Sequence, residues 1–276
     1  MVSCVAMEDG PDRSGGGATS ERGEPSSLRG PLSDVYFPAL AGGQAEALAR
    51  RLGERATVDD PIFGRTSGMP ALARYLDEVA AWIGKRAGAF EHVAYTVGSD
   101  RDVTEGVLQL TFEGRRVAVP VAVVAERRKE REVEIRLYYS TRPINGAHAV
   151  RSPLLPQDDE VAVPPPVASH LEALGRGDVG AIVASFEATG SLRDSQGKTF
   201  AVGPGELKAH YEALFGGGGI RVLKGARADD GRTCALEYTV VSVRGKTVPA
   251  QAGLAVYERG ESGLLHAARV YEDVEV

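Results

Sequence analysis

Cysteine is scarce in this 276-residue chain, which has two such residues, Cys4 and Cys234. Two cysteines cannot form a framework of disulfide bridges, and no Cys-x-x-Cys motif or Cys/His spacing indicates a bound metal. Long apolar runs are also missing, and because a spanning helix needs about 18 consecutive apolar residues, we expect no membrane partner. Near the N-terminus, Glu8 and Asp9 interrupt the apolar residues before they reach the length of a signal peptide. We therefore expect a cytoplasmic protein.

Basic surface stripes are a third feature that the sequence lacks. Its 38 acidic side chains outnumber its 32 lysines and arginines, and the formal net charge is −6. The densest basic cluster, residues 127–131, is broken by Glu126, Glu130 and Glu132, a pattern that is typical of a solvated hairpin tip. Because no basic patch interleaved with aromatic residues remains, we expect no nucleic-acid partner.

The composition is otherwise that of a globular protein, with 43% apolar and 25% charged residues. Two segments depart from it. Residues 1–33 are rich in Gly, Ser and Pro and hold almost no large apolar residue, so we expect a disordered tail. Residues 141–166 contain the run Pro164–Pro166 and further prolines, which predicts an extended, stiff linker. Two foldable blocks remain, residues 34–140 and 167–276.

The two blocks are similar to each other along their whole length, which indicates a repeat of a complete domain. When Leu40 is aligned with Leu174, Asp60 falls on Asp194. Near the ends of the blocks, the order of expected elements still agrees, and residues 136–138 (Arg-Leu-Tyr) match residues 269–271 (Arg-Val-Tyr). We therefore interpret the chain as a tandem duplication.

In each block the helices come first and the strands last. In the first block, Asp34 is expected to cap a helix that ends near Leu40, a short helix follows, and a long helix begins near Pro70. Apolar residues recur at helical spacing from Leu72 to Ile83. The β-rich stretches are 103–112, 117–126 and 133–139, repeated at 232–243, 247–258 and 264–271. This order predicts an α+β fold, with helices on one face of a curved antiparallel sheet.

The residues around Asp60 resemble a known family. The run from Ala56 to Pro61 (ATVDDP), followed by Arg65, Gly68 and Tyr75, resembles the ketosteroid-isomerase and SnoaL-like branch of the nuclear-transport-factor-2-like superfamily. The turn over residues 174–179 of the second block is similar to the same family. The resemblance implies two tandem copies of a cone-shaped α+β barrel, each a curved antiparallel sheet wrapped around a long helix with a mostly apolar pocket.

The resemblance also implies candidate catalytic residues. Asp60 falls on the general base of the family, and Tyr36 on the tyrosine that holds the developing oxyanion. In the second copy, Asp194 and His170 fall on the same two positions. Enzymes of this kind work without a cofactor, and we expect neither a cofactor nor a metal here.

A protonated acid, the third catalytic group of the family, has no counterpart in either copy. Its strand position falls within residues 121–123 of the first copy and near Gly253 in the second. Epoxide hydrolases of this fold pair the base with a second carboxylate, and Glu91, on the strand after the long helix, is the candidate for that part. The second copy has residues 220–222 (Ile-Arg-Val) in that region and no acid.

Each candidate also has a plainer structural interpretation. Asp60 before Pro61, and Asp194 in its polar setting, are both typical of turns. Tyr36 fits a packing residue of the first helix, and a single histidine such as His170 on a helix face is more often structural than catalytic.

Arginine and tyrosine alternate on the last strand of each copy. Arg136 with Tyr138, and Arg269 with Tyr271, each share one face of the sheet, which favours an interface or surface pair. Because domains of this family often associate sheet to sheet, we expect the two copies to form an intramolecular pseudo-dimer.

Three hypotheses about function stay open. The first is a cofactor-independent enzyme of the isomerase/cyclase type, which acts on an apolar small molecule bearing a carbonyl or epoxide. In it Asp60 is the general base, Tyr36 is the hydrogen-bond donor, and the first copy is the more active one. The second is a non-catalytic ligand-binding or scaffold module of the same fold. The third is an epoxide hydrolase or cyclase that uses Asp60 with Glu91.

Overall fold

A computed structural model describes residues 28–128, 132–195 and 199–273, so most of the expected tail and the centre of the charged hairpin tip lie outside the described residues. The first half consists of α1 (Leu32–Ala41), α2 (Ala45–Leu52), β1 (Thr57–Asp60), β2 (Gly64–Ser67), α3 (Ala71–Gly84), β3 (Ala89–Val97), β4 (Arg101–Phe112), β5 (Arg115–Arg127), β6 (Val133–Tyr138) and α4 (Arg142–Asn145). The second half consists of α5 (Pro165–Arg176), α6 (Val179–Ala184), β7 (Phe186–Arg193), β8 (Thr199–Val202), α7 (Pro204–Phe215), β9 (Ile220–Asp229), β10 (Thr233–Val243), β11 (Lys246–Arg259) and β12 (Leu265–Glu272).

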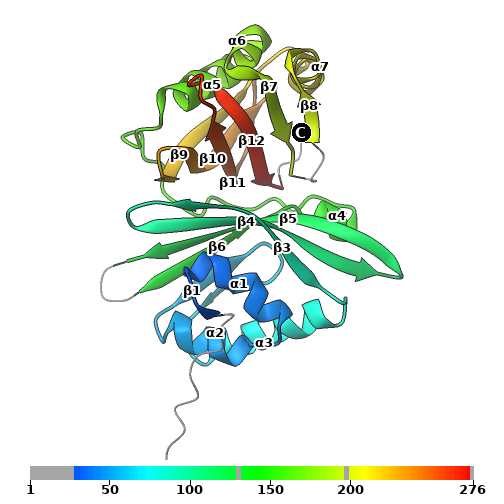
Figure 1. Cartoon of the computed structure of the whole chain (residues 1–276), viewed down its shortest axis with the longest axis vertical. Coiled ribbons are helices and arrows are strands. Elements are labelled where there is room, and N and C mark those ends of the chain that lie inside the picture. The colour runs from blue at the N-terminus through cyan, green and yellow to red at the C-terminus, as the bar shows by residue number, and fades with distance from the viewer. Residues whose placement is uncertain (1–27, 129–131, 196–198, 274–276) are drawn as a thin grey trace, which may run out of the picture.

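Both halves have the same sheet topology. The strand order is β2-β1-β6-β5-β4-β3 in the first sheet and β8-β7-β12-β11-β10-β9 in the second. All neighbours are antiparallel except β1 with β6 and β7 with β12, which pair in parallel, so the sheets are mixed rather than wholly antiparallel. Each half is thus the expected α+β unit, a curved sheet packed against its helices, and the chain holds two such units in tandem (Figure 1).

The start of the first helix differs from the expectation. α1 begins at Leu32 after Pro31, so Asp34 lies in its first turn and is not the capping residue. A proline fits the position before a helix because its fixed φ suits the extended backbone there. The Asp34 carboxylate is instead 3.3 Å from Nε2 of His92 on β3. Its negative charge in the first turn interacts favourably with the positive end of the helix dipole.

The borders of the tail and linker also differ from the expectation. Leu28 belongs to the first hydrophobic core, so the last residues of the predicted tail are part of the folded domain. Within the predicted linker, Arg142–Asn145 form the short helix α4. None of the helices in the described part of the chain combines the length and apolar character that a membrane crossing requires.

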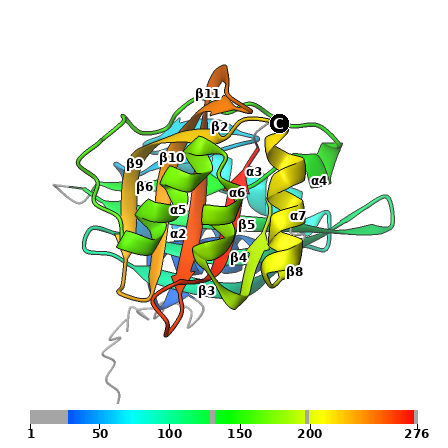
Figure 2. The same ribbon diagram turned by 90° about the horizontal axis from the view of Figure 1, so that it is seen from above.

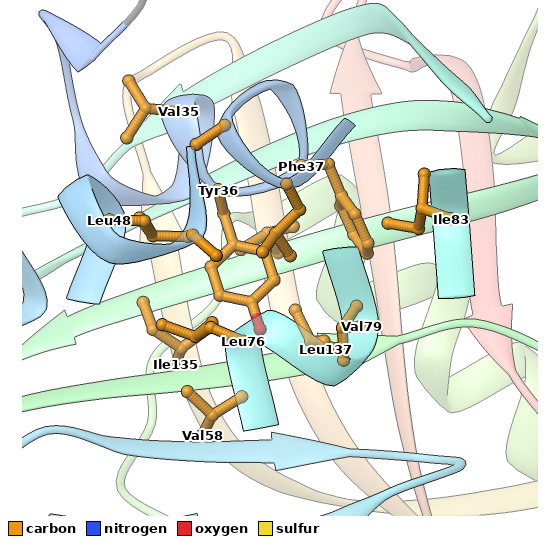
Figure 3. Close-up of a cluster of buried hydrophobic side chains, with 14 of the residues drawn as sticks. Val35, Tyr36, Phe37, Leu48, Val58, Leu76, Val79, Ile83, Ile135 and Leu137 are labelled. Carbon is orange, nitrogen blue, oxygen red and sulfur yellow. The ribbon is translucent and has the colours of Figure 1, made fainter. Parts of the chain in front are cut away.

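The long helix α3 fills the first half from one side of its sheet. Leu72, Leu76, Val79 and Ile83 form its buried stripe, as the periodicity predicts. Tyr36 of α1 lies beside this stripe within the same apolar cluster, shown in Figure 3. In the second half α5, α6 and α7 lie over the sheet in the same way (Figure 2).

The two sheets face each other in the middle of the molecule, with α1–α3 on one outer side and α5–α7 on the other (Figure 1). Arg136 donates from Nε and Nη2 to the carboxylate of Glu237, at 2.6 and 2.8 Å, and Tyr138 donates to the same carboxylate at 2.8 Å. Arg269 donates to Glu105 in the same two-pronged way, at 2.6 and 3.0 Å. Arg136 and Tyr138, expected as an interface or surface pair, therefore contact the other half of the chain.

Candidate functional site

The two halves differ most in the space between helices and sheet. The second half encloses a cavity of about 660 Å³, whereas the first retains a cavity of about 20 Å³, less than one water molecule occupies in the liquid. A volume near 660 Å³ lies in the range of small-molecule sites. The expectation that the first copy holds the more capable site does not fit these volumes.

In the first half, the carboxylate of Asp60 is surrounded by donors. Tyr75 donates to Oδ2 at 2.9 Å and Tyr139 to Oδ1 at 2.7 Å. The backbone N–H groups of Ile62 and Phe63 also donate to Oδ1, at 2.7 and 3.1 Å. Burial, reinforced by the negative charge of Asp60, raises the pKa of the Tyr139 hydroxyl, so it stays a donor. The four hydrogen bonds occupy the Asp60 carboxylate with donors of the protein itself.

Tyr36 does not touch Asp60 directly. Its hydroxyl is 2.9 Å from that of Tyr75, and because the Tyr75 proton goes to Asp60, Tyr36 is the donor. Burial is the main cause that raises the pKa of Tyr36. The tyrosines and Asp60 thus form one buried chain of hydrogen bonds, in a half with almost no free volume.

Glu91 is not brought to Asp60. It lies exposed on β3, where Nε2 of Gln109 donates to its Oε2 at 3.1 Å. Its neighbour Phe90 points the other way and stacks on Phe37 in the core. Successive side chains of a strand face opposite sides, so inward-facing Phe90 places Glu91 outside. The pairing of Asp60 with Glu91 is therefore wrong.

In the second half, Asp194 and His170 both line the large cavity. Asp194 follows β7, and His170 lies on α5. His210 of α7, which the family match did not single out, lines the cavity too and feels the charge of Asp194. Burial lowers the pKa of His210 and the Asp194 carboxylate opposes that shift, which places an acid and an imidazole together at one wall.

His170 is a neutral ring deep in the cavity wall. Burial lowers its pKa to about 4. Its Nδ1 is 3.1 Å from Oγ of Ser185, which gives its own proton to the carbonyl of Ile182 at 2.6 Å. Ser185 is therefore the acceptor, and Nδ1 of His170 carries the hydrogen. The Nε2 atom is left with a lone pair, so the ring can accept a hydrogen bond there.

An acid that sequence reasoning missed completes this cavity. Glu272, near the end of β12, lines it, and the hydroxyl of Tyr238 on β10 donates to its Oε2 at 2.6 Å. Burial raises the pKa of Glu272, although the Tyr238 hydrogen bond opposes the shift. A carboxyl with a raised pKa remains protonated at higher pH than usual and can donate a hydrogen bond.

A glycine makes room for this pair. Gly253 on β11 is the register partner of both Tyr238 and Glu272. A Cβ atom at Gly253 would lie 2.4 Å from Tyr238 Cε2 and 2.8 Å from Glu272 Oε2. The sequence has no counterpart of the family's third acid near this position, and the structure places the Glu272 carboxyl there from the neighbouring strand β12. The signal in the sequence was a glycine inside a β-rich run.

The first half has different residues at these positions. Gly106 pairs with Val121 where Tyr238 pairs with Gly253. Tyr139, one residue beyond the end of β6, takes the place of Glu272 and donates to Asp60. The side chains of Val121 and Tyr139 line what is left of the first cavity. The same fold is therefore filled in one half and hollow in the other.

No three His, Cys, Asp or Glu side chains of the described ranges converge to form a group that could hold a metal ion. The groups at the second cavity are instead those of proton transfer: a carboxylate beside an imidazole, and a carboxyl with a raised pKa.

Among known proteins, solved structures are similar to parts of this chain. No family model matches the chain, and no curated protein matches it. A solved NTF2-like protein of unknown function from Cytophaga hutchinsonii is similar at 17% identity and TM-score 0.32, over 39% of this chain and 87% of that one. A protein with a ketosteroid isomerase-like fold from Catenulispora acidiphila, in complex with trimethylamine, is similar at 18% identity and TM-score 0.35, over 41% and 88%. An epoxide hydrolase/cyclase-like enzyme from pyran ring formation in salinomycin is similar at 18% identity and TM-score 0.32, over 38% and 85%.

Proposed function

We propose that the second half is the working site of a cofactor-independent enzyme of the isomerase/cyclase type. Its substrate is an apolar small molecule with a carbonyl or epoxide oxygen. The observation that carries the proposal is the coincidence of a cavity of about 660 Å³ with two carboxyl groups in different surroundings, Asp194 and Glu272. Pairs of titratable groups whose environments differ are the usual basis for dividing base and acid roles.

In this proposal Asp194 is the general base. Beside it, His210 is either a second base or the group that takes the proton onward. Glu272 donates a hydrogen bond to the substrate oxygen, and the hydroxyl of Tyr238 stabilises the carboxyl as it loses its proton. His170, whose Nε2 is an acceptor, lies at the wall of the same cavity and would accept from a hydroxyl of the substrate or of the enol formed from it. Asp60 and Tyr36 remain candidates of the first copy, but its small cavity argues against them.

The test uses proton abstraction itself, because the substrate is not identified. We expect the protein to exchange the α-protons of an apolar ketone, 2-decalone, with deuterated water, as followed by NMR. Asp194→Asn should lower the rate by about 10²–10⁴-fold, the usual contribution of a positioned base. Asp77→Asn, an exposed change of the same chemistry on α3, should leave the rate unchanged. A full rate in Asp194→Asn would overturn the proposal, and loss in Asp60→Asn alone would return the site to the first half.

A scaffold role suits the first half. Its core leaves a cavity of only about 20 Å³, and the Asp60 carboxylate accepts four hydrogen bonds from the protein. We propose that this half binds no ligand of its own. It supports the second half through the facing sheets and through the α4 segment, residues 141–149.

A further inference from the structure

The rim of the second cavity is built partly by the first half of the chain. Of the described residues that line this cavity, Arg142, Gly146 and Ala147 are exposed, and the others are buried or half-buried. These three lie in or directly after α4. They therefore form the rim, and whatever enters the cavity passes them.

Arg142 is the one lysine or arginine among the described residues that line the cavity. Its Nη1 lies 3.2 Å from Nε2 of His148, whose Nδ1 lies 2.7 Å from the carboxylate of Asp273. Because a guanidinium can only donate, Nε2 of His148 accepts, and its Nδ1 carries the proton to Asp273. No carboxylate of the described residues forms an ion pair with Arg142, whose guanidinium donates to His148 instead.

Two further arginines extend this basic rim. A groove of about 590 Å³ adjoins the cavity and shares Arg142 and Gly146 with it. Arg115 and Arg116, at the start of β5, also line this groove. Neither has an ion pair among the described residues, unlike Arg65, Arg127 and Arg259, which each contact a carboxylate.

The interior has no basic charge of this kind, because no lysine or arginine of the described lining lies there. Asp194 and Glu272 line the inner cavity together with apolar and aromatic side chains. An anionic group would be repelled there and attracted at the rim, whereas an apolar body fits the interior.

We propose that Arg142, together with Arg115 and Arg116, forms an anion site at the rim of the second cavity. The ligand is then an apolar molecule that ends in an anionic group, a carboxylate or a phosphate, with the apolar body inside. The fork of a guanidinium suits both groups, because each offers two oxygens to parallel N–H donors. This proposal rests on the proposed function in one respect, the use of this cavity as the ligand site. It does not require that the ligand is turned over there.

The experiment compares three probes of equal chain length by isothermal titration calorimetry: octanoate, octyl phosphate and 1-octanol. We expect octanoate and octyl phosphate to bind at least about tenfold more tightly than 1-octanol at low salt. The difference should shrink as sodium chloride rises from about 50 to 300 mM, because salt screens an exposed ion pair. The ratio of octanoate to octyl phosphate shows which anion the site prefers.

Variants assign the effect to the rim. Arg142→Gln should weaken octanoate binding about tenfold and leave 1-octanol within twofold, and Arg142→Lys should restore part of the loss. Arg115→Gln and Arg116→Gln should each cause a smaller loss. Arg74→Gln removes the same charge from an exposed position on α3 and should change nothing. Circular dichroism confirms that each variant is folded.

Three results would overturn the inference. They are equal binding of octanoate and 1-octanol, octanoate binding that survives Arg142→Gln, and no binding of any probe. Arginine-dependent binding of octanoate by a protein that exchanges no ketone protons would leave the anion site standing and remove the proposed catalysis.

Discussion

At the scale of single residues, the difference between the two halves rests on a few positions. Gly253 has no side chain, and its two register partners, Tyr238 and Glu272, use the space to form a hydrogen bond at the cavity. In the first half Val121 and Tyr139 occupy the equivalent space. A change of one side chain in a close-packed interior alters both the cavity and the carboxyl that faces it.

Gly253→Ala tests this view of the cavity. The added Cβ would lie within 2.8 Å of both Tyr238 and Glu272, so we expect a loss of about 1–3 kcal/mol of stability in urea unfolding. Gly175→Ala on α5 is the matched control, since its Cβ meets nothing within 4 Å. It should gain roughly 0.5–1 kcal/mol from helix propensity. Equal effects of the two variants would contradict the packing argument.

Glu272 should also give the protein a pH dependence of known sign. Its pKa is raised in the folded state, so between the unfolded and folded pKa values the folded protein holds more protons than the unfolded chain. The stabilising contribution of Glu272 is then fully present below the unfolded pKa, about 4.3, and is lost as pH rises through the folded pKa. Because glutamine does not ionise, we expect Glu272→Gln to show no such loss of stability at high pH.

The measurement for Glu272 is the melting temperature of both proteins at pH 4 and pH 8. The melting temperature of Glu272→Gln should exceed that of the wild type at pH 8 but not at pH 4. Glu78→Gln, the same change of charge at an exposed position on α3, is the control. A gain that is the same at both pH values would mean that the carboxyl ionises freely in the folded state.

At the scale of elements, the α4 segment is fixed by one side chain. Asp273 follows β12, and its carboxylate is a common acceptor for the segment that leaves β6. Its donors are Ser140 Oγ, Thr141 N and Oγ1, His148 Nδ1 and Ala149 N. Although burial opposes ionisation, these hydrogen bonds hold the pKa of Asp273 below its usual range. The segment thereby joins the end of the first half to the rim of the second.

Asp273→Asn should release this segment. The amide keeps one acceptor oxygen and brings two N–H groups toward existing donors, so we expect a loss of about 2–4 kcal/mol in urea unfolding. Hydrogen exchange should accelerate in residues 141–149 more than in the core strands. Because the Asp273 contribution is present above the unfolded pKa and lost in acid, the difference from wild type should shrink toward pH 3. Unchanged exchange in 141–149 would show that Asp273 does not hold the segment.

The sequence predicted elements better than it predicted the site. The ranges 117–126 and 133–139 lie within two residues of β5 and β6, because long β-branched runs leave little alternative. The start of α1 was misplaced, since a proline before the helix replaced the expected aspartate cap. The match to the family placed Asp194 and His170, which do line the cavity.

What the sequence did not predict depends on strand register. Glu272 meets Tyr238 only because both are register partners of Gly253 across three strands. A single sequence holds no direct record of that register. Which half is hollow could not be predicted for the same reason, since Val121 and Tyr139 fill the first half through packing and not through any motif.

At the scale of the whole molecule, two reciprocal ion-pair networks join the sheets. Arg136 with Glu237, and Arg269 with Glu105, are equivalent pairs with exchanged halves, as an isologous contact requires. We propose that this pairing persists in solution as an intramolecular pseudo-dimer. The pairs differ in burial, because the Arg136 side chain is 0% exposed and that of Arg269 is 11% exposed.

The buried carboxylate that each variant leaves behind decides the size of its effect. Arg136→Met leaves Glu237 buried without its main partner and should cost about 3–5 kcal/mol of unfolding free energy. Arg269→Met leaves the Glu105 carboxylate, whose side chain is 0% exposed, with the Tyr271 hydroxyl as its donor, so it should cost a similar amount. The double variant Arg136→Met/Glu237→Gln should be more stable than Arg136→Met alone, since it leaves no unpaired charge. Urea unfolding of the full chain measures all three, and a cost below about 1 kcal/mol for Arg136→Met would mean that the sheets do not depend on this pair to stay together.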